Sequence, residues 1–121
     1  VVVMKDIYEM SMLIDFYGQL LTSSQLKCLE MHHNQDLSLA EIAEDMAISR
    51  QGVHDFIRRG RAALYEYEDK LGLLKKFKDI RKQLEAIQND FSFINKDSFD
   101  NENLELINEI ETRLTGIITR L

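Results

Sequence analysis

The sequence contains no proline, no tryptophan and only one cysteine among its 121 residues. It also lacks any run of about 18 apolar residues, the length that a membrane-spanning helix needs. The leading run Val1 to Val3 is too short for a signal peptide, so we expect no targeting segment and no membrane insertion. These absences favour a soluble, cytoplasmic protein.

The motifs that metal sites and enzymes require are missing as well. Cys28 cannot form an internal disulfide and is expected to be a small core residue. His32 and His33 are adjacent, so on a helix their side chains diverge by about 100° and do not converge on a metal ion. The sequence has no HExxH spacing, activated nucleophile or glycine-rich phosphate loop. We therefore expect no cofactor, no bound metal, no small-molecule substrate and no enzymatic activity.

Charge is abundant but unevenly distributed along the chain. The formal net charge is -6, yet residues 1–49 hold 2 basic and 8 acidic groups, residues 50–82 hold 10 and 5, and residues 83–121 hold 3 and 8. Phosphate affinity depends on the local basic surface, so a basic centre between acidic arms permits nucleic-acid binding. A solvated surface of mixed charge accounts for the same composition, and this alternative stays open.

The basic centre begins with a pattern typical of two short helices joined by a tight turn, SLAEIAEDMAISRQGVHDFIRRGR at residues 38–61. Ser38, with Glu41 three residues later, forms a capping-box pattern at the start of the first helix. Residues 47–48 are expected to form the turn. Ser49 is then the cap of the second helix, because its side-chain oxygen can accept a hydrogen bond from a free backbone amide.

The second helix of this motif has an apolar face and a polar face. The apolar face comprises Val53, Ile57, Gly60 and Leu64. The polar face comprises Arg50, Gln51, His54, Arg58 and Arg61. A helix of this kind can enter a groove of DNA, so it is the candidate recognition helix.

The rest of the first half is also helical in pattern. Apolar residues spaced by three and four predict one helix from Lys5 to Leu21, and the pair Thr22 and Gln25 predicts a capped helix from residue 23 to about His33. No segment alternates apolar and polar residues as a strand does. We therefore predict an all-α fold.

Beyond the recognition helix the pattern changes. Gly72 is expected to end that helix, which separates a helix-turn-helix domain at residues 1–71 from a helical extension at residues 72–121. The extension has two coiled-coil-like seams, Leu74, Phe77, Ile80, Leu84, Ile87 and Phe91, then Leu104, Ile107, Ile110, Leu114, Ile117 and Leu121. Asp100 is a possible cap of the last helix. The seams can pack on each other, on the first domain or on a second subunit.

Residues 21–64 are similar to region 4 of bacterial sigma factors, through an LT…Q…L helix, then SLAEIA, then ISR at the start of the recognition helix. A closer resemblance joins DFYGQLLT at 15–22, SLAEIAEDMAISRQGV at 38–53 and YEYEDKL at 65–71 to the YlxM-type helix-turn-helix proteins, which are associated with the signal recognition particle operon. This resemblance implies an all-α, dimeric DNA-binding regulator that acts in the signal recognition particle pathway.

The sigma pattern places base-reading roles on Arg50, Gln51, His54 and Asp55. An aspartate that faces phosphates is repulsive unless it accepts a hydrogen bond from a cytosine amino group. With the cap and the basic positions included, the residues expected to contact DNA are Ser49, Arg50, Gln51, His54, Arg58, Arg59 and Arg61.

Three functions are compatible with these features. The first is a sequence-specific regulator that binds double-stranded DNA. The second is a non-enzymatic helical module that docks on a protein partner, which the acidic arms and the two seams favour. The third is a binder of the protein or RNA of the signal recognition particle. In the first case we expect a homodimer whose C-terminal helices, with the first helix, form much of the interface.

Overall fold

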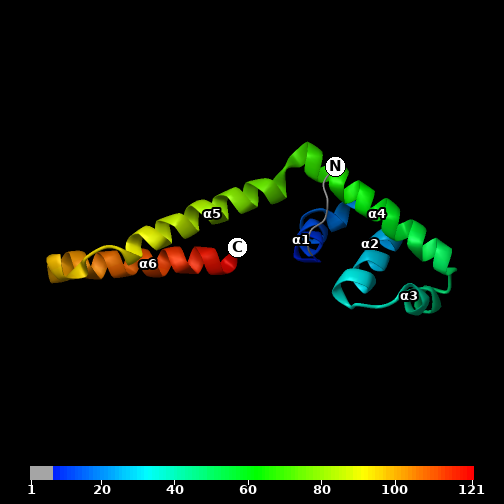
Figure 1. Cartoon of the computed structure of the whole chain (residues 1–121), viewed down its shortest axis with the longest axis horizontal. Coiled ribbons are helices and arrows are strands. Elements are labelled where there is room, and N and C mark those ends of the chain that lie inside the picture. Colours follow the sequence, from blue (N-terminus) through cyan, green and yellow to red (C-terminus); the bar gives the residue numbers. More distant parts are fainter. Residues whose placement is uncertain (1–6) are drawn as a thin grey trace. The chain divides into compact units, whose positions relative to one another are not determined.

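The structure is a computed structural model that describes residues 7–121, and every regular element within that range is a helix (Figure 1). The prediction of an all-α fold is confirmed. The chain divides into two compact units, one that ends at Leu74 and one that runs from Lys75 to Leu121. The role predicted for residues 72–121, dimerisation or partner docking, stays a prediction.

Short connections join the helices of both units. The elements of the first unit are α1 (Ile7–Tyr17), a 3₁₀ turn (Gly18–Leu20), α2 (Ser23–Leu29), a π-helical turn (Glu30–Asn34), α3 (Leu39–Met46) and α4 (Arg50–Leu71). They are followed by α5 (Leu73–Ser92), a 3₁₀ turn (Lys96–Ser98) and α6 (Asn101–Arg120). No helix described over residues 7–121 combines the length and the apolar character needed to cross a membrane.

The first helix is shorter than its sequence predicted. One helix was expected from Lys5 to Leu21, but α1 ends at Tyr17 and the chain tightens into the 3₁₀ turn; Lys5 and the side chain of Ile7 lie outside the described residues. Gly18 accounts for the early end, because glycine is a poor helix former. A methyl group at this buried position would lie 2.9 Å from Cδ1 of Leu26 in α2, so glycine also permits the close approach of that helix.

The start of α2 is as predicted, and its end is not. The Gln25 amide donates to Thr22 Oγ1 at 3.3 Å and the Thr22 amide donates to Gln25 Oε1 at 3.2 Å, which completes the capping box. The regular α-helix was expected to continue to about His33. The chain does stay helical past that residue, but its last 5 residues form a π-helical turn, in which each backbone bond spans one more residue.

The core of the first unit forms where α1, α2 and α3 pack on α4. Its most deeply buried side chains come from all four helices and are Met10, Tyr17, Cys28, Leu29, Ile42, Val53 and Leu64. Cys28 is therefore the core residue that the sequence predicted. The helices α2 and α4 approach closely at Gly60, where an added methyl group would lie 2.7 Å from Leu29 Cδ1. This buried apolar surface holds the recognition helix α4 against the three helices before it.

A partly buried polar network ties α1 to the end of α4. Gly72 takes the left-handed conformation (φ 63°) that ends α4, as predicted. The Tyr17 hydroxyl donates to Glu68 Oε1 at 2.6 Å and accepts from the Leu73 amide at 3.0 Å, and the Leu74 amide donates to the same Glu68 oxygen at 3.0 Å. These side chains therefore satisfy the first amides of α5, which have no acceptor within their own helix. Burial, followed by the hydrogen bond to Glu68, raises the pKa of Tyr17.

In the second unit α6 runs back along α5 (Figure 1). Asp100 caps α6, as predicted. Gln88 Nε2 donates to Thr115 Oγ1 at 3.1 Å across the two helices, and Lys96 in the connecting turn forms an ion pair with Glu111 of α6. The two helices therefore form an antiparallel hairpin.

The apolar seam of α6 differs from the predicted one. Leu114 is buried as predicted, but Ile110 and Ile117, which were expected to face inward, are 41% and 42% exposed, and Ile118 is buried instead. The buried and half-buried residues of this seam recur every three or four positions, as in a coiled coil, and are Leu104, Ile107, Glu111, Leu114 and Ile118. One of these positions is therefore occupied by a charged residue, Glu111, which is half-buried. An apolar pattern does not include a charged residue in a seam, so the sequence indicated the neighbouring isoleucines instead.

Candidate nucleic-acid interface

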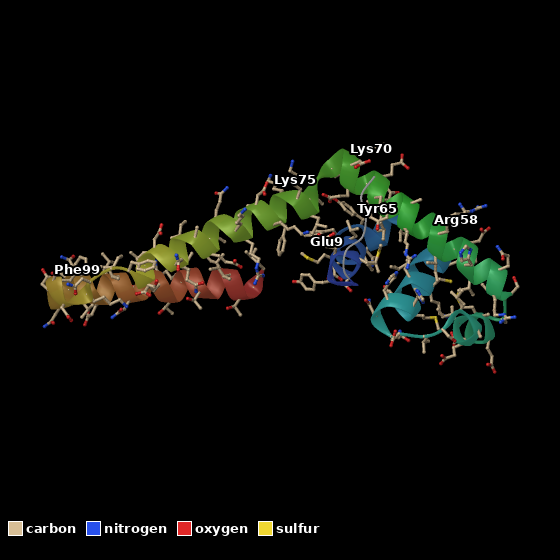
Figure 2. All side chains as sticks on the ribbon, viewed as in Figure 1. Glu9, Arg58, Tyr65, Lys70, Lys75 and Phe99 are labelled. Atoms are coloured by element: carbon tan, nitrogen blue, oxygen red, sulfur yellow. The ribbon has the colours of Figure 1, made fainter. Side chains whose placement is uncertain are left out.

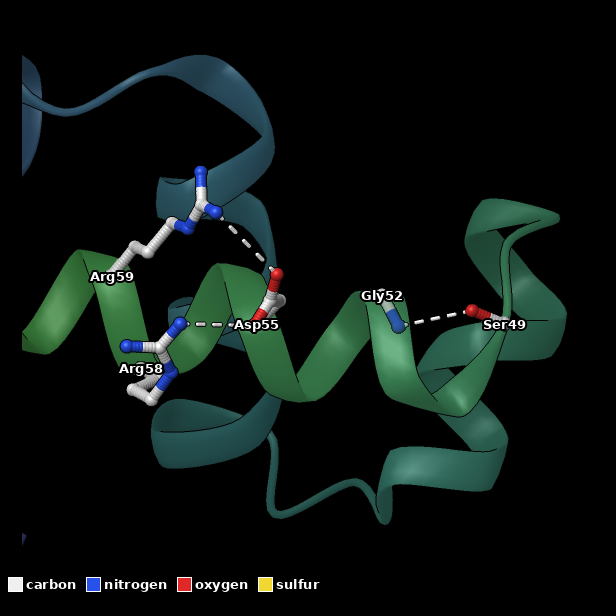
Figure 3. Close-up of polar contacts among 5 residues, drawn as sticks. All are labelled: Ser49, Gly52, Asp55, Arg58 and Arg59. Atoms are coloured by element: carbon white, nitrogen blue, oxygen red, sulfur yellow. Dashed lines mark hydrogen bonds and ion pairs between the residues drawn. The ribbon is translucent and has the colours of Figure 1, made fainter.

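Three consecutive residues form the turn between α3 and α4. Ala47 ends α3 in the left-handed conformation (φ 56°, ψ 44°), and the Ile48 amide donates to Ala43 O at 3.1 Å. Ser49 then caps α4, because its Oγ accepts a hydrogen bond from the Gly52 amide at 3.0 Å (Figure 3). The turn lies where the sequence placed it.

The short helix before the turn begins at the predicted capping box. The Glu41 amide donates to Ser38 Oγ at 3.2 Å, and the Ser38 amide donates to Glu41 Oε1 at 3.3 Å. Ile42 and Ala43 are the buried residues of α3 and pack toward α4. Residues 38–61 therefore form two helices joined by a tight turn, and both helices have a side-chain cap.

The recognition-helix candidate α4 has the two faces that its sequence predicted. Its buried residues are Val53, Ile57, Gly60 and Leu64. Arg50, Gln51 and His54 are exposed, and they form no hydrogen bond or ion pair with any residue in the described range 7–121. Their polar groups are therefore available to a ligand.

Asp55 lies on the same outer side of α4 and pairs with two arginines. Its Oδ1 accepts a hydrogen bond from Arg58 Nη2 at 3.1 Å, and its Oδ2 lies 3.7 Å from Arg59 Nη2 (Figure 3). The hydrogen bond from Arg58, with the positive charges nearby, lowers the pKa of Asp55, so the carboxylate is ionised at neutral pH. The sequence did not reveal these pairs, although their spacing of three and four residues is the spacing that brings helical side chains together.

Arg61, which was expected to contact DNA, is bound within the protein. Its Nη2 lies 2.8 Å from His33 Nε2, and its Nε donates to the same nitrogen at 3.3 Å. Because Nε2 accepts these bonds, the neutral imidazole carries its proton on Nδ1. Burial, followed by the positive charge of Arg61, lowers the pKa of His33 to about 4. This pair joins the π-helical turn to α4, and no motif in either segment indicated it.

The predicted contact residues therefore fall into three groups. Arg50, Gln51 and His54 are exposed and unpaired within residues 7–121. Arg58 and Arg59 are exposed but paired with Asp55. The two others have roles in the fold, since Ser49 caps α4 and Arg61 binds His33. Direct contact of any of the seven with nucleic acid stays a prediction.

A short capped helix, a turn with a left-handed residue and a second capped helix with outward polar side chains define the helix-turn-helix class of protein. Residues 4–107 match the sequence model of a family described as "Putative helix-turn-helix protein, YlxM / p13 like". The chain belongs to this family, and the resemblance to YlxM-type proteins is confirmed.

Relatives that carry the name UPF0122 protein are similar over nearly the whole chain. The relative from Acetivibrio thermocellus is 44% identical over 115 residues, which cover 95% of this chain and 98% of the relative. A relative from Clostridium kluyveri is 41% identical over 115 residues, covering 95% and 100%. A third, from Fusobacterium nucleatum, is 41% identical over 107 residues, covering 88% and 96%.

Proposed function

We propose that the protein is a DNA-binding regulator that inserts the N-terminal half of α4 into the major groove. The observation that carries this proposal is the exposure of Arg50, Gln51 and His54, which have no hydrogen-bond or ion-pair partner among residues 7–121, at the start of the second helix of the motif. In helix-turn-helix proteins this part of the helix contacts base edges, while the first helix crosses the backbone. All three side chains can donate hydrogen bonds to base edges or phosphates.

The neighbouring basic residues are suited to the DNA backbone. The side chains of Arg58 and Arg59 are 61% and 64% exposed, and Arg58 projects away from α4 (Figure 2). Phosphate contacts of this kind set the position of a protein on the duplex and carry no sequence information. Arg61 keeps the recognition helix in place through His33 and offers its remaining N–H groups.

Fluorescence anisotropy with a labelled duplex of mixed sequence, measured over a range of salt concentrations, tests the proposal. Arg50→Ala should weaken binding because a base contact is lost, and Arg58→Ala should also reduce the slope of log affinity against log salt by about one unit, because a phosphate contact is lost. Lys70→Ala is the matched control. It removes the same charge from the same helix, but Lys70 lies near the opposite end of α4 (Figure 2) and pairs with Glu66.

If Arg50→Ala and Lys70→Ala bind the duplex like the parent, the N-terminal half of α4 is not the binding surface. If both weaken binding equally, only the net charge of the helix matters, and the groove insertion is wrong. A parent protein whose binding does not depend on salt contradicts a phosphate contact altogether.

We propose further that the protein binds DNA as a homodimer, since a single helix-turn-helix makes few base contacts. Four isoleucines of the hairpin support a second copy as partner, because they are between 41% and 46% exposed and recur seven residues apart on each helix: Ile80 and Ile87 on α5, Ile110 and Ile117 on α6. Replacing Ile110 and Ile117 with aspartate should produce a folded monomer with weaker DNA binding. Light scattering that finds the parent monomeric at micromolar concentration contradicts the dimer.

We propose further that this regulator acts in the cytoplasm, and that it acts in the signal recognition particle pathway, as the family resemblance implied. A pull-down from a lysate with and without nuclease treatment separates the alternatives. DNase should release the partners of a DNA-binding regulator. Partners that are released only by RNase favour binding to the RNA of the particle, and partners that resist both nucleases favour docking on a protein.

A further inference from the structure

Asp55 lies at the centre of the face that would meet DNA. It is one helical turn after Gln51 and one turn before Arg58 and Arg59, and its side chain is 43% exposed. An ionised carboxylate offers only hydrogen-bond acceptors, and it repels phosphate. A surface made only for sequence-independent binding would gain affinity if this anion were removed.

The two arginines compensate Asp55 in the free protein, through contacts of 3.1 Å to Arg58 and 3.7 Å to Arg59. Phosphate oxygens compete for the same guanidinium groups when DNA binds. Asp55 then loses these partners and enters a partly dehydrated groove, which is unfavourable unless a new donor reaches the carboxylate.

Only some base pairs can supply that donor. In the major groove the amino groups of cytosine and adenine are the donors, whereas guanine and thymine present acceptors. Adenine also places its N7 acceptor beside its amino group, so a carboxylate pairs better with cytosine. The base that satisfies the carboxylate therefore differs from those that arginine or glutamine would select.

We propose that Asp55 is a specificity-determining residue, which accepts a hydrogen bond from a cytosine amino group and disfavours sites with an acceptor at that position. This inference rests on the DNA-binding function proposed above. In this proposal Arg58 and Arg59 have two states, because they bind Asp55 in the free protein and bind phosphates in the complex with DNA. Asp55 lowers the affinity for DNA in general and thereby increases the difference between a correct and an incorrect site.

A purely stabilising role for the ion pairs predicts a different behaviour, since a structural contact does not distinguish DNA sequences. The chain offers a matched control on the same helix. Lys70 and Glu66 also form an exposed pair, with a spacing of four residues and a distance of 3.0 Å, and they lie beyond the helix-turn-helix motif of residues 38–61.

The test is selection of binding sites from a pool of duplexes with a random central sequence, followed by sequencing of the bound fraction. The parent should select a motif in which one position prefers cytosine by about tenfold, the size of one good base contact. Asp55→Asn should change that preference to adenine, because an amide pairs with the N6 and N7 groups of adenine. The same variant should bind the unselected pool more tightly, while Glu66→Gln should keep the motif and the affinity of the parent.

A motif that is unchanged in Asp55→Asn, or changed equally by Glu66→Gln, overturns the assignment of Asp55. Failure of the proposed function has a different signature. In that case the parent enriches no motif, Arg50→Ala binds the pool like the parent, and both proposals fall together. Melting curves of Asp55→Asn and the parent should coincide, because an exposed substitution away from packed or capped positions changes stability little.

Discussion

Replacing Gly60 with alanine tests the packing that holds the recognition helix. A methyl group at this position would lie 2.7 Å from Leu29 Cδ1, 3.4 Å from Leu29 Cγ and 3.5 Å from Gln25 Cβ. Favourable contacts between carbon atoms lie at about 3.5–4.0 Å. Leu29 is fully buried. Its side chain, or the helix α2 that carries it, must therefore shift to admit the methyl group.

The size of the effect is the difference between two opposed contributions. Adding a methyl group to a well-packed core costs about 1–3 kcal/mol. Replacing glycine with alanine inside a helix is favourable by about 0.5–1 kcal/mol. For Gly60→Ala we therefore expect the free energy of unfolding of the first unit to fall by about 1 kcal/mol, the difference between the middles of the two ranges.

Gly116 of α6 is the matched control. It also lies inside a helix, but apart from its two neighbours in the chain and the backbone of its own helix, no described atom lies within 4 Å of the place where its methyl group would be. Gly116→Ala should therefore stabilise the second unit by about 0.5–1 kcal/mol. Urea unfolding followed by circular dichroism measures both variants. A Gly60→Ala protein that is as stable as the parent would refute the close approach of α2 and α4.

The remaining predictions concern a cap, a buried hydroxyl and a histidine. Ser49→Ala should lower the stability by about 1 kcal/mol in thermal denaturation, because the cap of α4 is lost, and Ser49→Gly should lower it less; an unchanged melting temperature would mean that α4 does not depend on this cap. Tyr17→Phe should cost about 1–2 kcal/mol, because the hydroxyl bond to Glu68 is lost, and a neutral result in urea unfolding would contradict that bond. Burial, followed by the charge of the neighbouring arginine, lowers the pKa of His33 from 6.5 to about 4. Between these pH values the unfolded chain binds one proton more than the folded chain at this residue. The stability that comes from the neutral imidazole is therefore present above pH 6.5 and is lost as the pH falls toward 4. His33→Gln should reduce that loss relative to the parent, and identical pH profiles of the two proteins would speak against a neutral His33.

The features that the sequence predicted correctly are encoded by residues a few positions apart. Ser38 and Ser49 each accept a hydrogen bond from the amide three residues later, and Gly72 ends α4 in the left-handed conformation. The buried face of α4 follows from the spacing of its apolar residues. Such features depend on residue type and spacing alone, so one sequence is sufficient to indicate them.

Contacts between distant segments could not be predicted in this way. His33 and Arg61 are 28 positions apart, and Tyr17 and Glu68 are 51 positions apart. Each pair exists because helix packing brings the two side chains together, and the sequence around either residue does not indicate which residue it contacts. The seam of α6 was predicted only in part for a related reason, since Glu111 occupies a position that an apolar pattern leaves out. The sequence therefore indicated the outer face of α4 but not which of its arginines are already paired.

The central claim is that the N-terminal half of α4 is the surface that contacts DNA. Its most direct test is to map the backbone amide resonances of the protein by NMR during titration with a duplex. The account predicts that resonances of residues 49–59 shift most, and that those of residues 75–121 change little once the oligomeric state is held constant. Shifts concentrated on α5 and α6, with the resonances of residues 49–59 unchanged, would contradict it.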